Sequence, residues 1–181
     1  MKDLGELKYF LSIEFSRSHE GIVMCQRKYT LELVSELGLA GKKPAVIPLE
    51  FNHKLASIEF DKKIQNDNTT MDKELEDKGS YQRLVGRLLY LTMTRPDIIF
   101  VVQVFSQYMH APKLSHMEAA LRVVRYIKIA PGLRLFMLAK ACKQLVAYCD
   151  SDWGACVKTK RSVTGYAVKF YEALISWKSK K

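Results

Sequence analysis

The stretch "SHMEAALRVVRYIKIAPGLRLFML", residues 115–138, changes its hydrophobic pattern halfway along. Before Pro131 its apolar residues recur at helical spacing, and Ser115 with Glu118 has the spacing of a capping box. Pro131-Gly132 ends that pattern, and the "LRLFML" that follows is typical of a strand. We therefore expect an α+β chain with a boundary near Pro131.

Two helices are predicted on the N-terminal side of this stretch. "RPDIIFVVQVFSQYMHAP", residues 95–112, places Pro96 in a first helical turn, where its missing N–H is tolerated. "SYQRLVGRLLYLTM", residues 80–93, places Arg83 and Arg87 on one face and an apolar set on the other: Tyr81, Leu84, Val85, Leu88 and Leu89. Residues 80–131 are thus predicted to form a helical region.

The N-terminal part, residues 1–49, has a different pattern. Two β-rich runs in "KYFLSIEFSRSHEGIVMCQ" flank His19-Glu20-Gly21, which predicts a hairpin, and a helix is predicted in "RKYTLELVSELGLAG". Residues 50–79 show little periodicity and are predicted to be a flexible acidic linker.

Short strands dominate the C-terminal part, residues 132–181. After "LRLFML" come "QLVAYCD", "SVTGYAVKF" and "ALISWKS", separated by turns or polar loops. We expect them to form an incomplete sheet.

The charge of the chain points to a polyanionic partner. The formal net charge is +10, and residues 50–78 hold 8 acids and 5 bases, which leaves 11 acids and 24 bases in the parts expected to fold. Nucleic acid is the first partner to expect and an anionic membrane surface the second, while a basic surface without any partner stays an alternative.

Cysteine and histidine spacing gives no sign of a zinc site. The four cysteines form no C-x-x-C pair and the four histidines are scattered, so free thiols in a reducing compartment are expected. Neither a signal peptide nor an apolar run of membrane-spanning length is visible. We expect an intracellular protein, cytoplasmic or nuclear, that does not associate with membranes.

Several stretches, in this order, resemble the Pol polyprotein of Ty1/copia-type LTR retrotransposons. They are "MKDLGELKYFLSIEF", "QRKYTLELVSELGL", "YQRLVGRLLYLTMTRPDI", "SQYMHAPKLSHMEAALRVVRYIK", "AYCDSDWGACVKTKRSVTGY" and "LISWKSKK". The resemblance implies that the chain begins after the catalytic palm of the reverse transcriptase. It further implies a hairpin and a helical thumb- and connection-like part, followed by the start of an RNase H-like sheet.

The resemblance also bears on catalysis. The two metals of a polymerase need the aspartates of a Y-x-D-D motif, which is absent from this chain. Asp150 matches the first metal-binding aspartate of the family's RNase H domain, with Asp152 beside it, but the next family carboxylate belongs to an S-S-x-E-A-E-Y segment beyond "SWKSKK". Asp150 is therefore expected to be a vestigial catalytic residue in an incomplete metal site. Mg²⁺ would bind only if that site were completed, and no other cofactor is expected.

The function predicted is that of a Pol fragment that does not catalyse alone and at most binds nucleic acid, either an RNA–DNA hybrid or a duplex. Phosphate contacts need cationic donors along a groove. The candidates are Arg83, Arg87, Arg122, Arg125, Lys158, Lys160 and Arg161.

Three alternatives stay open. The chain could be an RNase H or reverse-transcriptase component that acts only with segments supplied in trans by a fuller Pol protein. It could be an interaction or effector-like protein on the same scaffold, although no signal peptide or R-x-L-R motif is present. It could also be a gene remnant with uncovered apolar surface and poor solubility.

Overall fold

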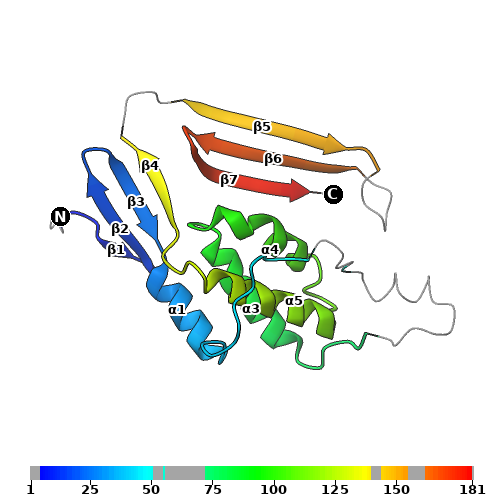
Figure 1. Cartoon of the computed structure of the whole chain (residues 1–181). Coiled ribbons are helices and arrows are strands. Elements are labelled where there is room, and N and C mark those ends of the chain that lie inside the picture. The colour runs from blue at the N-terminus through cyan, green and yellow to red at the C-terminus, as the bar shows by residue number, and fades with distance from the viewer. Residues whose placement is uncertain (1–4, 51–54, 56–71, 140–143, 155–161, 181) are drawn as a thin grey trace.

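Two antiparallel sheets and a group of helices make up the described part of the chain in a computed structural model (Figure 1). The structure describes residues 5–50, 55, 72–139, 144–154 and 162–180. The α+β class predicted from the pattern change around Pro131 is confirmed.

The first sheet joins the beginning of the chain to a strand far along it. Its order is β1-β2-β3-β4, with the bounds Tyr9–Phe10, Ile13–Ser18, Gly21–Cys25 and Arg134–Leu138. All its pairs are antiparallel, and β4 runs from Arg134 opposite Cys25 to Leu138 opposite Gly21. The predicted "LRLFML" strand thus exists, but it pairs with the N-terminal hairpin and not with the strands that follow it in sequence.

Two tight turns shape this sheet. The predicted hairpin turn lies at His19-Glu20, because Ser18 pairs with Gly21. A second turn, between β1 and β2, consists of Leu11 and Ser12 with φ angles of 46° and 60°. Such left-handed backbone suits the twist of a two-residue hairpin but favours Gly or Asn. The Tyr90 hydroxyl donates a hydrogen bond to the Leu11 carbonyl and ties this turn to helix α3.

The helices form one apolar core. They are α1 (Arg27–Glu36), α3 (Lys78–Leu91), the 3₁₀ turn η1 (Pro96–Ile98), α4 (Ile99–Ser106) and α5 (Leu114–Ile127). Four of the five apolar residues predicted on α3 are buried, whereas Leu89 is 38% exposed. The buried Tyr81 hydroxyl donates to the Phe105 carbonyl at 2.9 Å, which joins α3 to α4. Pro96 opens η1 as predicted.

Buried ion pairs hold the ends of these helices. Arg95, only 2% exposed, donates two hydrogen bonds to the Asp97 carboxylate at 2.9 and 2.6 Å and one to the Ala130 carbonyl at 2.9 Å. Its guanidinium also lies 5.8 Å from the centre of the Tyr126 ring. The start of α4 is thereby fixed to the end of α5.

The start of α5 differs from the prediction. The capping box of Ser115 with Glu118 is wrong, because the helix begins at Leu114 with Lys113 as its N-cap. Ser115 instead donates through its backbone N–H and its hydroxyl to Asp72, at 3.3 and 2.5 Å. A carboxylate from the predicted linker therefore helps to cap α5, together with His116, whose Nδ1 accepts a 3.1 Å hydrogen bond from the Lys113 N–H. The rest of that linker lies mostly outside the described residues.

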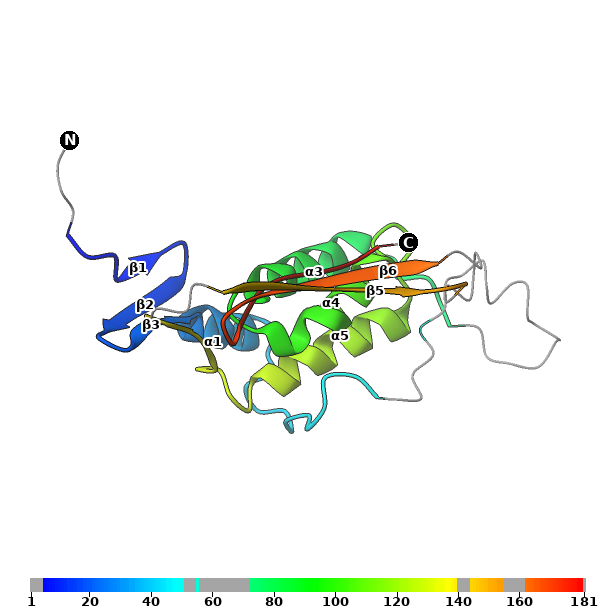
Figure 2. The same cartoon turned by 90° about the horizontal axis from the view of Figure 1, so that it is seen from above.

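The second sheet has the order β5-β6-β7, with the bounds Leu145–Asp152, Val163–Phe170 and Ala173–Lys180. Figures 1 and 2 show that it covers one side of the helices. Its contact with α4 uses the Phe100 and Trp177 rings, 6.3 Å apart, and a 2.9 Å hydrogen bond from Gln103 Nε2 to the Ser179 carbonyl. Strand β5 lies at the free edge and is exposed at every position except Val146.

None of the described helices is both long enough and apolar enough to span a membrane.

Candidate nucleic-acid interface

The predicted arginines of α3 both face carboxylates. Arg83 is 72% exposed and lies 3.6 Å from the Asp77 carboxylate. Arg87 forms an ion pair with Glu36 of α1, and its guanidinium lies 5.5 Å from the centre of the Tyr29 ring. Burial lowers the pKa of Arg87, but its bonds to Glu36 and Tyr29 outweigh that effect and raise the pKa. Arg87 is thus engaged between two helices.

The basic residues on and just after α5 are covered by the segment that follows α1. Arg122 pairs with Glu50 at 2.7 Å. The neighbouring Lys128 donates to the Leu39 and Lys42 carbonyls at 3.3 and 2.7 Å. Arg125 is half-buried, and its carbonyl accepts a 3.3 Å hydrogen bond from the Ala45 N–H. Of the predicted helix cations, Arg125 alone has no charged partner within the described residues.

The predicted loop cations Lys158, Lys160 and Arg161 lie outside the described residues. Only the four predicted helix arginines can therefore be compared with the predicted nucleic-acid interface. Three of them form ion pairs, with Asp77, Glu36 and Glu50. The four arginines therefore do not line one groove as unpaired cations.

Asp150 and Asp152 lie exposed near the end of the edge strand β5. Oδ1 of Asp150 accepts a 2.9 Å hydrogen bond from the N–H of Ser151, and Gly165 is its partner across the sheet. Within the described ranges, no group of three or more His, Cys, Asp or Glu side chains could hold a metal ion around them. The described residues thus do not fit a two-metal centre, and Asp150 as a vestigial ligand stays a prediction.

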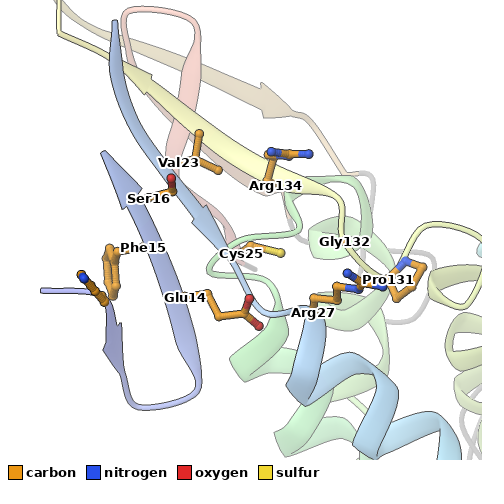
Figure 3. Close-up of a pocket in the computed structure, with 10 residues that line it drawn as sticks. Glu14, Phe15, Ser16, Val23, Cys25, Arg27, Pro131, Gly132 and Arg134 are labelled. Carbon is orange, nitrogen blue, oxygen red and sulfur yellow. The ribbon is translucent and has the colours of Figure 1, made fainter. Parts of the chain in front are cut away.

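A cationic cavity of about 590 Å³ lies where the first sheet meets the start of α1 (Figure 3). Lys8, Arg27 and Arg134 line it together with Glu14, and Pro131-Gly132 form part of its wall. We call it the sheet cavity. Neutral residues complete the lining: Phe15, Ser16, Val23 and Cys25.

Strand pairing explains how the sheet cavity is assembled. Glu14, Cys25 and Arg134 are direct partners across three neighbouring strands, so they lie in one row on one face of the sheet. Arg27 follows two residues after Cys25 as the first residue of α1. A Cβ added to Gly132 would lie 3.6 Å from Cδ of Arg27, so the Arg27 stem runs along the backbone of the loop.

The charges in the sheet cavity are not neutralised from within. Glu14 Oε1 accepts a 3.2 Å hydrogen bond from the Lys28 N–H and so caps α1. None of Lys8, Arg27 and Arg134 forms an ion pair with another described residue. A neighbouring hollow of about 290 Å³ shares Lys8, Phe15 and Ser16 and adds Glu6, Leu7 and Arg17.

The sequence patterns did not predict this site. Its cations come from residues 8, 27 and 134, and the third reaches the cavity only because β4 pairs with β3. That pairing between distant segments was the missing signal.

The chain is similar to several known proteins. It is 34% identical over 185 residues to an uncharacterized mitochondrial protein of Arabidopsis thaliana, an alignment that covers all of this chain and 70% of that protein. It is 35% identical over 181 residues to the retrovirus-related Pol polyprotein from transposon RE1 of Arabidopsis thaliana, covering the whole chain but only 12% of the polyprotein. It is also 37% identical over 102 residues to secreted RxLR effector protein 161 of Plasmopara viticola, covering 56% of this chain and 72% of that protein.

No family model matches the chain. No solved structure matches it either.

Proposed function

The chain belongs to the Pol polyproteins of Ty1/copia-type LTR retrotransposons, and from this premise we propose that it is a nucleic-acid-binding portion of such a polyprotein without catalytic activity of its own. Residues 1–49 and 80–131 would serve as the thumb- and connection-like part, and the sheet β5-β6-β7 as the beginning of an RNase H-like domain. The ligand would be an RNA–DNA hybrid or a duplex.

One observation carries this proposal: three cations line the sheet cavity without an ion-pair partner in the described chain. A phosphate backbone needs cationic donors that are not already neutralised, because binding gains from the release of counterions from the nucleic acid. Half-buried Arg125, which has no charged partner among the described residues, would extend the contact along the helices.

The distribution of carboxylates in the described residues supports the proposed lack of catalysis. Stabilising both the attacking and the leaving oxygen with two metals requires several converging carboxylates, whereas Asp150 and Asp152 form a local pair on an exposed strand. In a second candidate function, a fuller Pol protein supplies the missing ligands in trans. Mg²⁺-dependent cleavage of a hybrid that Asp150→Asn abolishes would establish that function in place of the first.

An interaction protein is the third candidate. The similarity over 102 residues to the secreted effector protein favours this function. Under this function, nucleic-acid affinity would be absent at low salt.

The test of the proposed function is the binding of a labelled RNA–DNA hybrid by the whole chain, followed by fluorescence anisotropy as salt is raised. We expect binding at about 50 mM salt and a linear fall of log K with log salt, because each phosphate contact contributes about −0.9 to the slope for a duplex. No binding at that salt concentration would overturn the proposal.

A further inference from the structure

We propose that the sheet cavity is a phosphate-binding site, in which Arg27 and Arg134 together hold one phosphate group. The phosphate would be carried by a nucleotide or by a nucleic-acid strand. This inference rests on the proposed nucleic-acid binding and assigns it to a particular site.

The charge of the cavity favours an anion. Three cations and one carboxylate line it, and the carboxylate already accepts the Lys28 N–H at the start of α1. Like charges that face one cavity repel each other, and a bound anion converts this repulsion into attraction. Guanidinium groups are especially suited to phosphate because their N–H donors match its oxygens in pairs.

The position of Arg27 supports a role in binding. It is the first residue of α1, where the positive end of the helix dipole disfavours a cation. No carboxylate lies in the first turn of α1 to compensate for it. The Glu14 carboxylate at the start of α1 compensates part of this cost, and a phosphate at the cavity would add to that compensation.

The size and the neutral lining suit one nucleotide unit. Small-molecule sites commonly measure about 300–1,000 Å³, and the sheet cavity has about 590 Å³. Val23, on the same face of the sheet as Cys25 and Arg134, offers apolar contact for a sugar or a base beside the cations. In Figure 3, Arg27 and Arg134 lie on the same side of the row formed by Ser16 and Val23, with Cys25 between the sheet and the loop at Pro131.

Cys25 provides a reporter inside the site. Its free thiol is partly buried and lines the cavity, whereas the free thiol of Cys149 is exposed on β5 in the other sheet. A ligand in the cavity would slow alkylation of Cys25 and leave Cys149 unchanged. Peptide mass mapping after a short alkylation pulse reads the two thiols in one sample.

The first experiment compares inorganic phosphate, a mononucleotide and a short oligonucleotide as protecting ligands for the whole chain. Protection of Cys25 by phosphate or the mononucleotide would identify a site for a single phosphate group. Protection by the oligonucleotide alone would identify a site for a strand. If none of the three slows alkylation of Cys25, the proposal is overturned.

The second experiment uses the double variant Arg27→Gln/Arg134→Gln with Lys43→Gln as a control. Lys43 is exposed beyond the opposite end of α1 and also carries one positive charge. We expect the double variant to weaken oligonucleotide binding about tenfold or more, because charge-assisted bonds to phosphate are lost. We expect less than about a twofold change for the control, since a single distant charge acts only through a screened field.

Thermal melting shows whether the double variant still folds. A variant that melts like the unaltered chain and binds hybrid with unchanged affinity would overturn the phosphate site, while the proposed function would stand. If the unaltered chain does not bind the RNA–DNA hybrid, the proposed function itself is overturned. If the double variant fails to fold, the Cys25 protection experiment on the unaltered chain decides alone.

Discussion

Two groups of basic residues in this protein differ in what surrounds them. Arg87 and Arg122 face carboxylates from other parts of the chain, Glu36 and Glu50, and Arg95 faces Asp97, two residues away. The sheet-cavity residues Lys8, Arg27 and Arg134 form no ion pair with another described residue, and the one carboxylate that lines the cavity with them caps a helix. The same side-chain chemistry thus stabilises the fold in one region and is available for a ligand in the other.

The largest loss of stability is expected for a substitution at Arg95. We expect Arg95→Ala to lower the free energy of unfolding by about 3–5 kcal/mol, because Asp97 would lose both hydrogen bonds from its partner in a mostly buried place. Urea unfolding followed by circular dichroism measures the change. Arg134→Ala serves as the control, for which we expect about 0.5 kcal/mol or less. Equal effects of the two substitutions would erase the difference between the regions.

The carboxylate Asp72 tests the same contrast at the start of α5. We expect Asp72→Ala to cost about 1–3 kcal/mol, because it removes both bonds from Ser115 and the 3.2 Å ion pair with Lys113. Glu32→Ala serves as the control, because its 4.0 Å pair with Lys28 is exposed, and we expect it to be nearly neutral. A neutral Asp72→Ala would show that the acidic segment does not hold the helix.

Acid should weaken the paired region before it affects the cavity cations. Burial raises the pKa of Asp72 and of Asp97, but hydrogen bonds from Ser115 and Lys113 in one case and from Arg95 in the other bring both pKa values below the usual 3.8. A depressed pKa in the folded state stabilises the fold above 3.8, and this stabilisation is lost as the pH falls through the lower, folded value.

The free energy of unfolding should therefore decrease as the pH is lowered from about 6 to about 3. The slope should be smaller in Asp97→Asn than in the unaltered chain. An identical slope in both proteins would contradict the assignment to Asp97.

The turn between β1 and β2 can be tested by a substitution that does not change the charge. Ser12→Gly should raise the free energy of unfolding by about 0.5–1 kcal/mol, because glycine accepts the φ of 60° at this turn without a Cβ clash. Ser176→Gly, in the extended backbone of β7, should instead destabilise. Loss of stability in Ser12→Gly would show that the turn is not left-handed.

The smallest effect on stability is expected inside the sheet cavity. Arg27→Gln should change the free energy of unfolding by less than about 0.5 kcal/mol, with a slight gain favoured, because it removes a cation from the positive end of α1. Thermal melting at low salt measures it. Destabilisation beyond about 1 kcal/mol would move Arg27 into the group of structural arginines.

Periodicity predicted the local elements of this chain well and their long-range pairing poorly. The spacing of Tyr81, Leu84, Val85 and Leu88 located the buried face of α3, and Pro96 located the start of η1. The pairing of β4 with β3 joins segments more than a hundred residues apart, as in Arg134 with Cys25, and no local pattern encodes it. That pairing creates the sheet cavity, which is why the sequence did not reveal the site.

The acidic segment explains why the predicted arginines turned out differently. Glu50, Asp72 and Asp77 lie at its described ends, and they pair with Arg122, Lys113 and Arg83 of the helices. The sequence indicated an acidic linker separate from basic helices. Folding brings these opposite charges together, because exposed and half-buried cations gain from a nearby carboxylate.

The most direct test of the two-region account is the salt dependence of RNA–DNA hybrid binding in two charge-matched variants. One is Arg27→Gln/Arg134→Gln in the sheet cavity, and the other is Arg83→Gln/Arg125→Gln on the helices. We predict that the cavity variant lowers the slope of log K against log salt by about 0.9, which corresponds to the loss of one phosphate contact, and that the helix variant lowers it by less than about 0.5. A full loss of slope in the helix variant with none in the cavity variant would contradict the account.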